Sequence, residues 1–197
     1  MPVDLKKYPI GVRYATSPLA IAPASGTILR DGKPSDWLYI DHLRKKEGDS
    51  LGFIPKDAYL SVLERKPYSG RYRFLYQGIL ITEDNGQQTG FCYFSILPPW
   101  AKVFQIVVQE DARRWYRATL MLQEVERRAR ENGCVGVRCR VAVDLEANFF
   151  WRAMGYEPVK VVTSTWLNQR LSRSGRLLWI YRKYLRAVPQ QLSLGLV

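Results

Sequence analysis

The sequence predicts a mixed α/β (α+β) fold, with a mostly antiparallel sheet, one central βαβ crossover and helices on both faces. Three observations carry this prediction. Two strand-like runs flank a turn at residues 84–86, which is typical of a hairpin. A continuous apolar run at 103–108 is followed by a helical pattern and then by another strand pattern, which indicates a parallel crossover. Two further strand-like runs close the sheet near residue 185.

The first elements are two amphipathic helices and the hairpin. Residues 35–48 open with serine and aspartate, which favour a helix start, and then place Trp37, Ile40 and Leu43 three apart on one face. Residues 56–66 repeat the helical spacing over a shorter segment. The hairpin follows, with Asp-Asn-Gly as its turn.

The second half contains the crossover and the closing strands. After the strand 103–108, we expect a helix of about twenty residues from Ala112 to a stop at Gly133. The remaining predicted elements are a strand at 135–143, a helix at 144–155, and two closing strands at 159–167 and 175–185.

Composition limits the classes of function. The chain has 197 residues, 47% of them apolar, which suits one folded domain. Thirty Lys and Arg against 18 Asp and Glu give a net charge of +12, which favours DNA or another polyanion as partner. Three scattered cysteines and one histidine do not form the usual zinc ligand sets, so we expect no metal. No apolar run is long enough to span a bilayer, and we expect a cytoplasmic protein without membrane contact.

Residues 113–118, Arg-Arg-Trp-Tyr-Arg-Ala, follow the apolar strand and resemble the Gcn5-related N-acetyltransferase (GNAT) superfamily. The family pattern is Arg/Gln-x-x-Gly-x-Gly/Ala, and its backbone N–H groups hold the coenzyme A pyrophosphate at a helix N-terminus, a general anion site. The resemblance also implies that residues 105–108 splay from the following parallel strand. Tyr116 stands where the family has glycine. Either its ring turns outward, or the donor has been lost, or a different donor is bound.

Residues 144–156, from Asp144 to Tyr156, resemble the second family signature, Asn-x-x-Ala-x-x-Phe-Tyr-x-x-x-Gly-Phe. Trp151 replaces the tyrosine that protonates the leaving thiolate in many members, and an indole is no useful acid. Tyr156 is more typical of a core aromatic. The resemblance implies acetyl-CoA or another acyl donor, with these residues as its binding site: Val107, Val108, Arg113, Arg114, Trp115, Tyr116, Arg117, Ala118, Asn148 and Trp151.

Three side chains are candidates for catalysis. Gln105 lies on the apolar strand where some members have a carboxylate, and an amide can orient a water or an amine. His42 carries an imidazole, a common proton-transfer group, but it also fits a solvated basic helix face. Asp144 is most simply a helix N-cap. Positioning an amine against a thioester supplies much of the acceleration without a strong base.

The chain divides into a single GNAT-like domain, residues 1–186, and a tail, residues 187–197, which we expect to be flexible. The tail sequence QLSLGL resembles the peptide by which bacterial replication and repair proteins bind the sliding clamp. The clamp-binding positions would be Gln191, Leu192, Leu194 and Leu196.

Three functions remain open from the sequence. One is a GNAT-fold acyltransferase, associated with DNA, that acylates an amine on DNA or on a DNA-bound protein. Another is a DNA adenine-modifying protein resembling the phage Mom protein, which has a GNAT-like fold. The third is a non-enzymatic, degenerate GNAT-fold module that binds DNA or the clamp.

Overall fold

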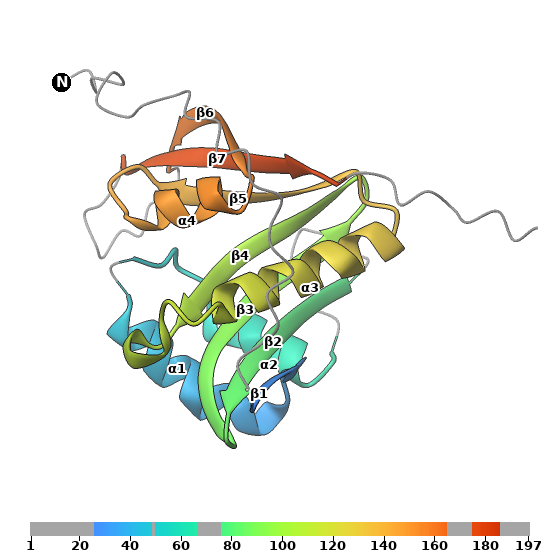
Figure 1. The fold of residues 1–197 in the computed structure, drawn as a ribbon, viewed down its shortest axis with the longest axis vertical. Helices are drawn as coiled ribbons and strands as arrows, with labels where there is room; N and C mark the ends of the chain where they lie inside the picture. Colours follow the sequence, from blue (N-terminus) through green and yellow to red (C-terminus); the bar gives the residue numbers. More distant parts are fainter. Residues whose placement is uncertain (1–25, 49, 67–75, 165–174, 186–197) are drawn as a thin grey trace, which may run out of the picture.

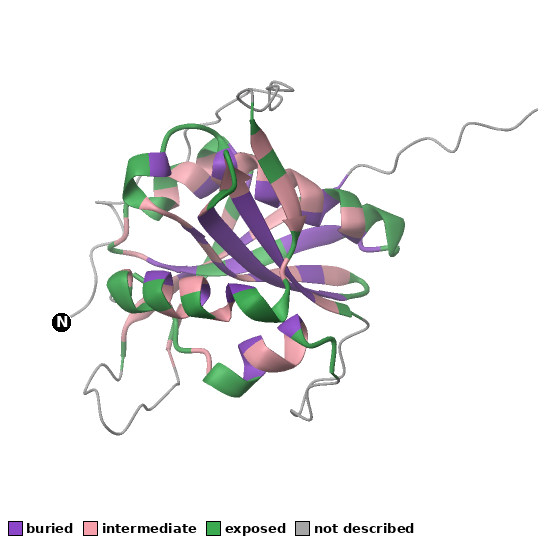
Figure 2. Cartoon of the chain, turned by 90° about the horizontal axis from the view of Figure 1, so that it is seen from below, coloured by how far each residue is buried: buried purple, intermediate pink, exposed green. Residues whose placement is uncertain are grey.

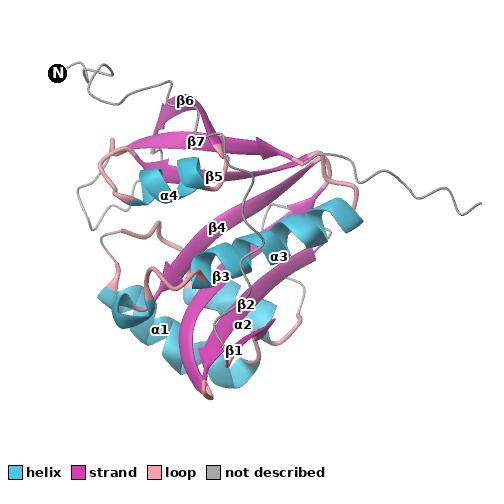
Figure 3. Cartoon of the chain, in the orientation of Figure 1, coloured by secondary structure: helices cyan, strands magenta, loops and turns pink. Residues whose placement is uncertain are grey.

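The computed structural model describes residues 26–48, 50–66, 76–164 and 175–185 (Figure 1). In this part of the chain the strands form one sheet in the order β1-β2-β3-β4-β5-β7-β6, antiparallel except for β4 and β5 (Figure 3). The strands are β1 Thr27–Asp31, β2 Tyr76–Asp84, β3 Gln87–Leu97, β4 Trp100–Val108, β5 Gly136–Ala142, β6 Glu157–Thr163 and β7 Leu177–Tyr184. The α-helices are α1 Trp37–Lys46, α2 Lys56–Leu63, α3 Arg117–Glu131 and α4 Ala147–Ala153.

The predicted hairpin is confirmed as β2 and β3. Its turn places Asn85 and Gly86 at φ values of 50° and 81°, the left-handed conformations that asparagine and glycine adopt most easily. The edge strand β1 pairs with β2, and the Thr27 hydroxyl donates to Asp84 Oδ1 at 2.7 Å. This region therefore forms the way the turn chemistry predicts.

Two apolar clusters hold helices on opposite faces of the sheet. On one face α1 and α2 contribute Ile40, Leu43 and Tyr59, which pack with side chains of β2, β3 and β4. On the other face α3 and α4 cover the sheet, with Met121 and Trp151 in that cluster. Figure 2 shows the buried strands between these layers. The fold class predicted from the sequence is confirmed.

The start of α3 corrects a prediction. The helix begins at Arg117, five residues after the expected Ala112, because the chain passes through a short 3-10 turn at Glu110–Ala112 and then a loop. In that loop Arg114 and Tyr116 have φ values of 66° and 63°, which a helix cannot contain. The loop itself is part of the candidate site.

Residues 187–197, with the proposed clamp-binding positions, lie outside the described residues. Within the described ranges, no helix combines the length and the apolarity needed to cross a membrane. The same part of the chain contains no group of three or more His, Cys, Asp or Glu side chains that could hold a metal ion.

Candidate active site

Strand β4 changes the side that its side chains face at a bulge. Its register against β3 pairs Val103 with Phe94 and Gln105 with Tyr93, so Phe104 is an extra residue. Before the bulge, Val103 packs under α3; after it, Gln105 lies on the face of α1 and α2. The bulge thus directs Gln105 toward the helices that follow β1.

The parallel strands β4 and β5 pair at only three positions, from Trp100 with Gly136 to Lys102 with Arg138. Beyond Lys102 the strands diverge toward the side where α3 and α4 begin (Figure 1). The splay predicted for residues 105–108 is therefore confirmed. The β5-facing backbone groups of this part of β4 lack a ladder partner in β5, and such groups can bind an extended ligand.

The loop before α3 has a left-handed residue, Tyr116, at the position where the family motif has glycine. Tyr116 has φ 63° and ψ 8°, a left-handed conformation that favours glycine. Its side chain is 52% exposed and that of Trp115 is 60% exposed. The ring is therefore exposed, while the three alternatives for donor binding at Tyr116 stay open. The unpaired N–H groups of the first turn of α3 follow directly, which is the arrangement of an anion site.

The three arginines of the loop differ in what they contact. Arg117 is buried, and its Nε donates to Asp84 Oδ2 at 2.8 Å while Nη1 donates to the Trp115 carbonyl at 3.1 Å. Its side chain holds the loop against the hairpin, and its place in the donor site stays a prediction. Arg113 donates from Nε to the Val108 carbonyl at 3.1 Å and pairs with Glu47 at 2.6 Å.

Arg114 is the loop arginine that remains available. It is exposed and has no hydrogen bond or ion pair with another described residue. Three other predicted donor-binding residues are packed into the fold: Val107 is buried beneath α1 and α2, Val108 packs toward α3, and Ala118 is half-buried. Arg114, in contrast, supplies an exposed cation.

The α4 signature is present, but its side chains are used inside the fold. Asn148 Nδ2 donates to the carbonyls of Ala142 at 2.8 Å and Leu145 at 2.6 Å, and its Oδ1 accepts from the Tyr181 hydroxyl at 3.0 Å. Asn148 therefore fastens the end of β5 to α4. Trp151 is 4% exposed, with its ring in a T-shaped contact to Tyr156. Both side chains are thus engaged within the protein, and their contact with an acyl donor stays a prediction.

Tyr156 is the core aromatic that the sequence predicts. It is buried, and its hydroxyl donates to Glu126 Oε1 at 3.1 Å. Lys183 Nζ binds both oxygens of the same carboxylate, at 2.8 and 2.9 Å. Burial raises the pKa of Tyr156 well above its ordinary value, and the nearby Glu126 raises it further. Because the phenol is buried and already donates to Glu126, it is not available to a leaving thiolate.

Gln105 is buried and engaged at both ends of its amide. Its Nε2 donates to the Gly52 carbonyl at 2.6 Å, and its Oε1 accepts from the Tyr59 hydroxyl. Burial raises the pKa of Tyr59 well above its ordinary value, so the hydroxyl stays protonated and keeps this hydrogen bond. Gln105 thus fixes the segment between α1 and α2 against the open part of β4. Its predicted catalytic role stays a prediction.

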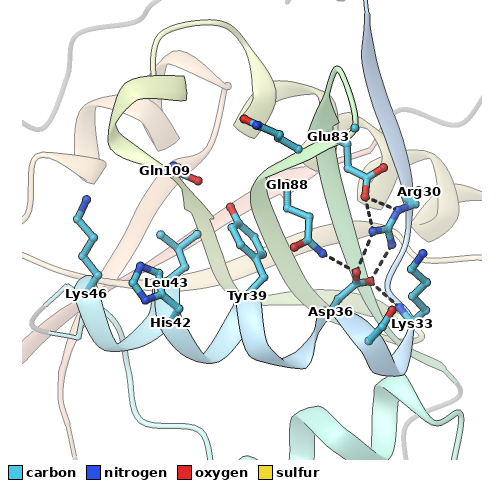
Figure 4. Close-up of a pocket in the computed structure, with 13 residues that line it drawn as sticks. Arg30, Lys33, Asp36, Tyr39, His42, Leu43, Lys46, Glu83, Gln88 and Gln109 are labelled. Carbon is cyan, nitrogen blue, oxygen red and sulfur yellow. Dashed lines mark hydrogen bonds and ion pairs between the residues drawn. The ribbon is translucent and has the colours of Figure 1, made fainter.

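His42 and Asp144 lie elsewhere. His42 is exposed on α1 and lines a pocket of about 580 Å³ between α1 and the hairpin, which Gln105 does not line (Figure 4). Asp144 is exposed and binds Arg176 at 3.0 Å. It is not the N-cap of α4, because the helix starts at Ala147 with Glu146 at the cap position. The three catalytic candidates therefore do not form one cluster.

The pocket in Figure 4 is built around the buried carboxylate of Asp36, for which the sequence predicted only a role at the helix start. Asp36 accepts from Arg30 at 2.7 and 2.8 Å, from the Gln88 side chain at 2.5 Å, and from the Lys33 N–H at 2.8 Å. The network joins β1, α1 and the hairpin. Its bonds are satisfied within the protein, so we regard it as structural.

The open edge of β4 lies beside the N-terminus of α3, and a fold with this arrangement can hold an extended ligand that carries phosphates. The acetyltransferase (GNAT) family matches residues 49–156, which is more than half of the chain. The chain belongs to this family. No curated protein sequence matches it.

Solved structures agree with the family at the level of the fold. The chain is similar to the ribosomal-protein-S18-alanine N-acetyltransferase from Escherichia coli, with 14% identity, a TM-score of 0.62, and coverage of 84% of this chain and 98% of that chain. It is also similar to Arabidopsis thaliana NAA60 in complex with a bisubstrate analogue, with 13% identity, a TM-score of 0.66, and coverage of 82% and 99%. A third similar structure is an N-acetyltransferase from Staphylococcus aureus Mu50, with 17% identity, a TM-score of 0.63, and coverage of 82% of this chain and 100% of that chain.

Proposed function

We propose that this protein is an N-acetyltransferase that uses acetyl-CoA or another acyl-CoA donor. The observation that carries the proposal is the end of β4–β5 pairing at Lys102, directly before a left-handed loop that opens α3. The open β4 edge would receive the amides of the pantetheine arm, and the α3 N-terminus with Arg114 would receive the pyrophosphate. Both groups of a coenzyme A thioester thus have a matching partner.

In the reaction the acceptor nitrogen attacks the thioester carbonyl carbon. A C–N bond forms, the C–S bond breaks, and the proton lost by the amine balances the proton taken up by the thiolate. The residues of this chain contribute by holding the donor along β4 and by fixing the α1–α2 segment through Gln105. Trp151 at the family's acid position is buried and its indole is no useful acid, so this proposal assigns no acid to that position.

Calorimetry with acetyl-CoA and coenzyme A tests the donor. We expect binding, and we expect Arg114→Ala to weaken it by about 1.5–3 kcal/mol, the range for a hydrogen bond to a charged group. Arg127→Ala is the control, because Arg127 is exposed on α3 and pairs with Glu124. Absence of binding to the unaltered protein would overturn the proposal and favour a non-enzymatic module.

The acceptor is an amine, and we propose that it is carried by DNA or by a DNA-bound protein. The net charge of +12 supports this choice. Mass spectrometry of nucleosides from DNA incubated with the protein and donor separates acylation from a Mom-like adenine modification by mass. Unmodified DNA together with an acylated DNA-bound protein would leave the protein as the acceptor.

The clamp-binding peptide remains a separate proposal. A synthetic peptide of residues 187–197 should bind a bacterial-type sliding clamp in the micromolar range, about −8 kcal/mol. Replacing Gln191 and Leu192 by alanine should abolish this binding. Equal binding of the altered peptide would remove the proposal.

A further inference from the structure

The C-terminal half of the sheet presents four basic side chains on one face. On β5, Cys139 points into the core, whereas Arg138 and Arg140 on either side of it are exposed. Arg182 of β7 lies directly opposite Arg138 in the sheet register, and Lys102 of β4 pairs with Arg138 from the other side. Three strands therefore bring these cations to the face that α3 and α4 do not cover. We call it the basic face.

The charges of the basic face are not neutralised by the described part of the chain. None of the four residues has an ion pair or a side-chain hydrogen bond with a described residue. Glu157 lies opposite Arg182 on β6, yet no ion pair forms between them. By contrast, Arg128 on α3 forms ion pairs with Asp31 and Glu124. Four like charges at neighbouring strand positions repel one another, so an anion bound there would be favoured.

Aromatic rings lie among these cations. Trp100 and Tyr184 flank Gly136, with ring centroids 5.2 Å apart, and Tyr184 is 69% exposed. The Arg182 guanidinium lies 5.3 Å from the Trp100 ring centroid. A Cβ at Gly136 would come within 2.4 Å of Trp100, so this glycine makes room for the ring.

We propose that the basic face binds a single-stranded nucleic acid. Its phosphates would contact the arginines and Lys102, and its bases would stack on the rings of Trp100 and Tyr184. Arginine matches phosphate geometry, and cations mixed with aromatic rings on an open sheet are typical of single-strand binding. An acidic peptide would satisfy the charges but would make no use of the rings. A duplex would hide its bases from them.

The position of the basic face connects it to the candidate active site. Lys102 and Gln105 lie on the same face of β4, because Ser95 and Tyr93, their partners on β3, are two residues apart. A nucleic acid bound on the basic face could therefore extend from Lys102 toward Gln105 and the open part of β4, where we propose that the acyl donor binds. Only this connection rests on the proposed acetyltransferase function; binding itself does not.

Fluorescence anisotropy with a labelled oligothymidylate of about fifteen nucleotides tests the proposal on the full chain, without any acyl donor. The affinity should fall with salt. The double variant Arg138→Gln with Arg140→Gln should bind on the order of tenfold more weakly, with a salt slope flatter by about 1.4, since each phosphate contact on a single strand contributes about 0.7. Tyr184→Ala should weaken binding about fivefold or more through lost stacking.

The matched control is Arg127→Gln with Arg130→Gln, which removes the same charge from the exposed side of α3. It should change the affinity less than twofold. Equal loss in both double variants would mean that net charge alone binds the strand, and would overturn the proposal. Equal competition by polyglutamate and by unlabelled oligonucleotide would also overturn it. Unchanged coenzyme A binding by the Arg138 and Arg140 variant would show that it folds and that the acyl site is independent.

Discussion

The two halves of the sheet differ in whether their charged side chains have partners within the described part of the protein. Strands β1 to β3 have helices on both faces, and their charged side chains are paired, as in the Arg30–Asp36 network. Strands β5 and β7 are covered by α3 and α4 on one face, and on the other they carry Arg138 and Arg182 without a described counter-ion. Buried charge in the first half has to be satisfied internally, whereas the second half keeps charge free for a partner.

The largest expected effect is the loss in the free energy of unfolding when Asp36 is replaced. Burial raises the pKa of this carboxyl, but the hydrogen bonds from Arg30 and the Lys33 N–H outweigh it, so the pKa lies below its ordinary value. Asp36→Ala would leave Arg30 partly buried without its main partner, and we expect a loss of about 3–5 kcal/mol in the free energy of unfolding.

Urea denaturation measures this loss. Asp41→Ala is the control, since Asp41 pairs with Arg44 and Lys45 on the surface of α1 and should contribute no more than about 1 kcal/mol. Equal, small losses in both variants would mean that the Asp36 network is not the tie between β1, α1 and the hairpin.

The contrast between these halves was only partly visible in the sequence. Asn85–Gly86 predicts the hairpin because the turn chemistry is local, and Ile40 and Leu43 predict the buried face of α1. The roles of Asp36 and Asn148 were not predictable, because their partners come from distant segments. The signal that could have revealed the basic face was the alternation Arg-Cys-Arg at 138–140 within a predicted strand.

The start of α3 shows a different limit. Residues 113–116 contain no proline or glycine, so helical spacing extends through them. What stops the helix is tertiary: Arg113 caps the end of β4, and Arg117 turns back to Asp84. Local propensity cannot include such contacts.

A matched pair of arginines would sharpen the comparison. Arg128 pairs with Glu124 and Asp31, at 2.7 Å each, and Arg128→Gln should cost about 1 kcal/mol. Burial lowers the pKa of Arg138, and the nearby Arg140 and Arg182 lower it further. Arg138→Gln should therefore be neutral or stabilising by up to about 1 kcal/mol. Thermal unfolding of both variants at low salt measures the difference, and a loss in Arg138→Gln equal to that in Arg128→Gln would contradict the comparison.

The loop between the halves should respond to relief of its backbone strain. Tyr116→Gly should stabilise the protein by about 0.5–1 kcal/mol. A left-handed residue with a Cβ costs about 1–2 kcal/mol, and the larger conformational entropy that glycine loses on folding offsets part of this gain. Acyl-CoA affinity should be equal or better. Tyr116→Ala removes the ring but keeps the strain, so it should leave the free energy of unfolding nearly unchanged. Stabilisation by alanine as large as by glycine would mean that the ring, and not the backbone, is unfavourable.

The smallest expected effect is the pH dependence from Lys102. Burial lowers the pKa of its ammonium to about 8, with further lowering by Arg140 and Arg138, against an ordinary value of 10.5. The groups around it are these two arginines on β5, the Phe104 ring 4.2 Å away and the buried Ser95 on β3, so no described acid opposes the shift. Between pH 8 and 10.5 the unfolded chain binds more protons at this position than the folded chain. The contribution of Lys102 to stability therefore rises with pH across this window.

Other groups titrate in the same window, so the measurement has to be a difference. Burial raises the pKa of the Cys92 and Cys139 thiols, which makes the unfolded chain release their protons first and lowers stability above about pH 9. This decline is common to the unaltered protein and to Lys102→Met and cancels between them. The difference in unfolding free energy, unaltered minus variant, should grow by a few tenths of a kcal/mol from pH 8 to 10 because Lys102 is partly exposed and screened. Lys45→Met, on the exposed surface of α1, should give a flat difference. A flat difference for Lys102→Met as well would show that the basic face does not repel its own charges, and would remove the physical reason for an anion to bind there.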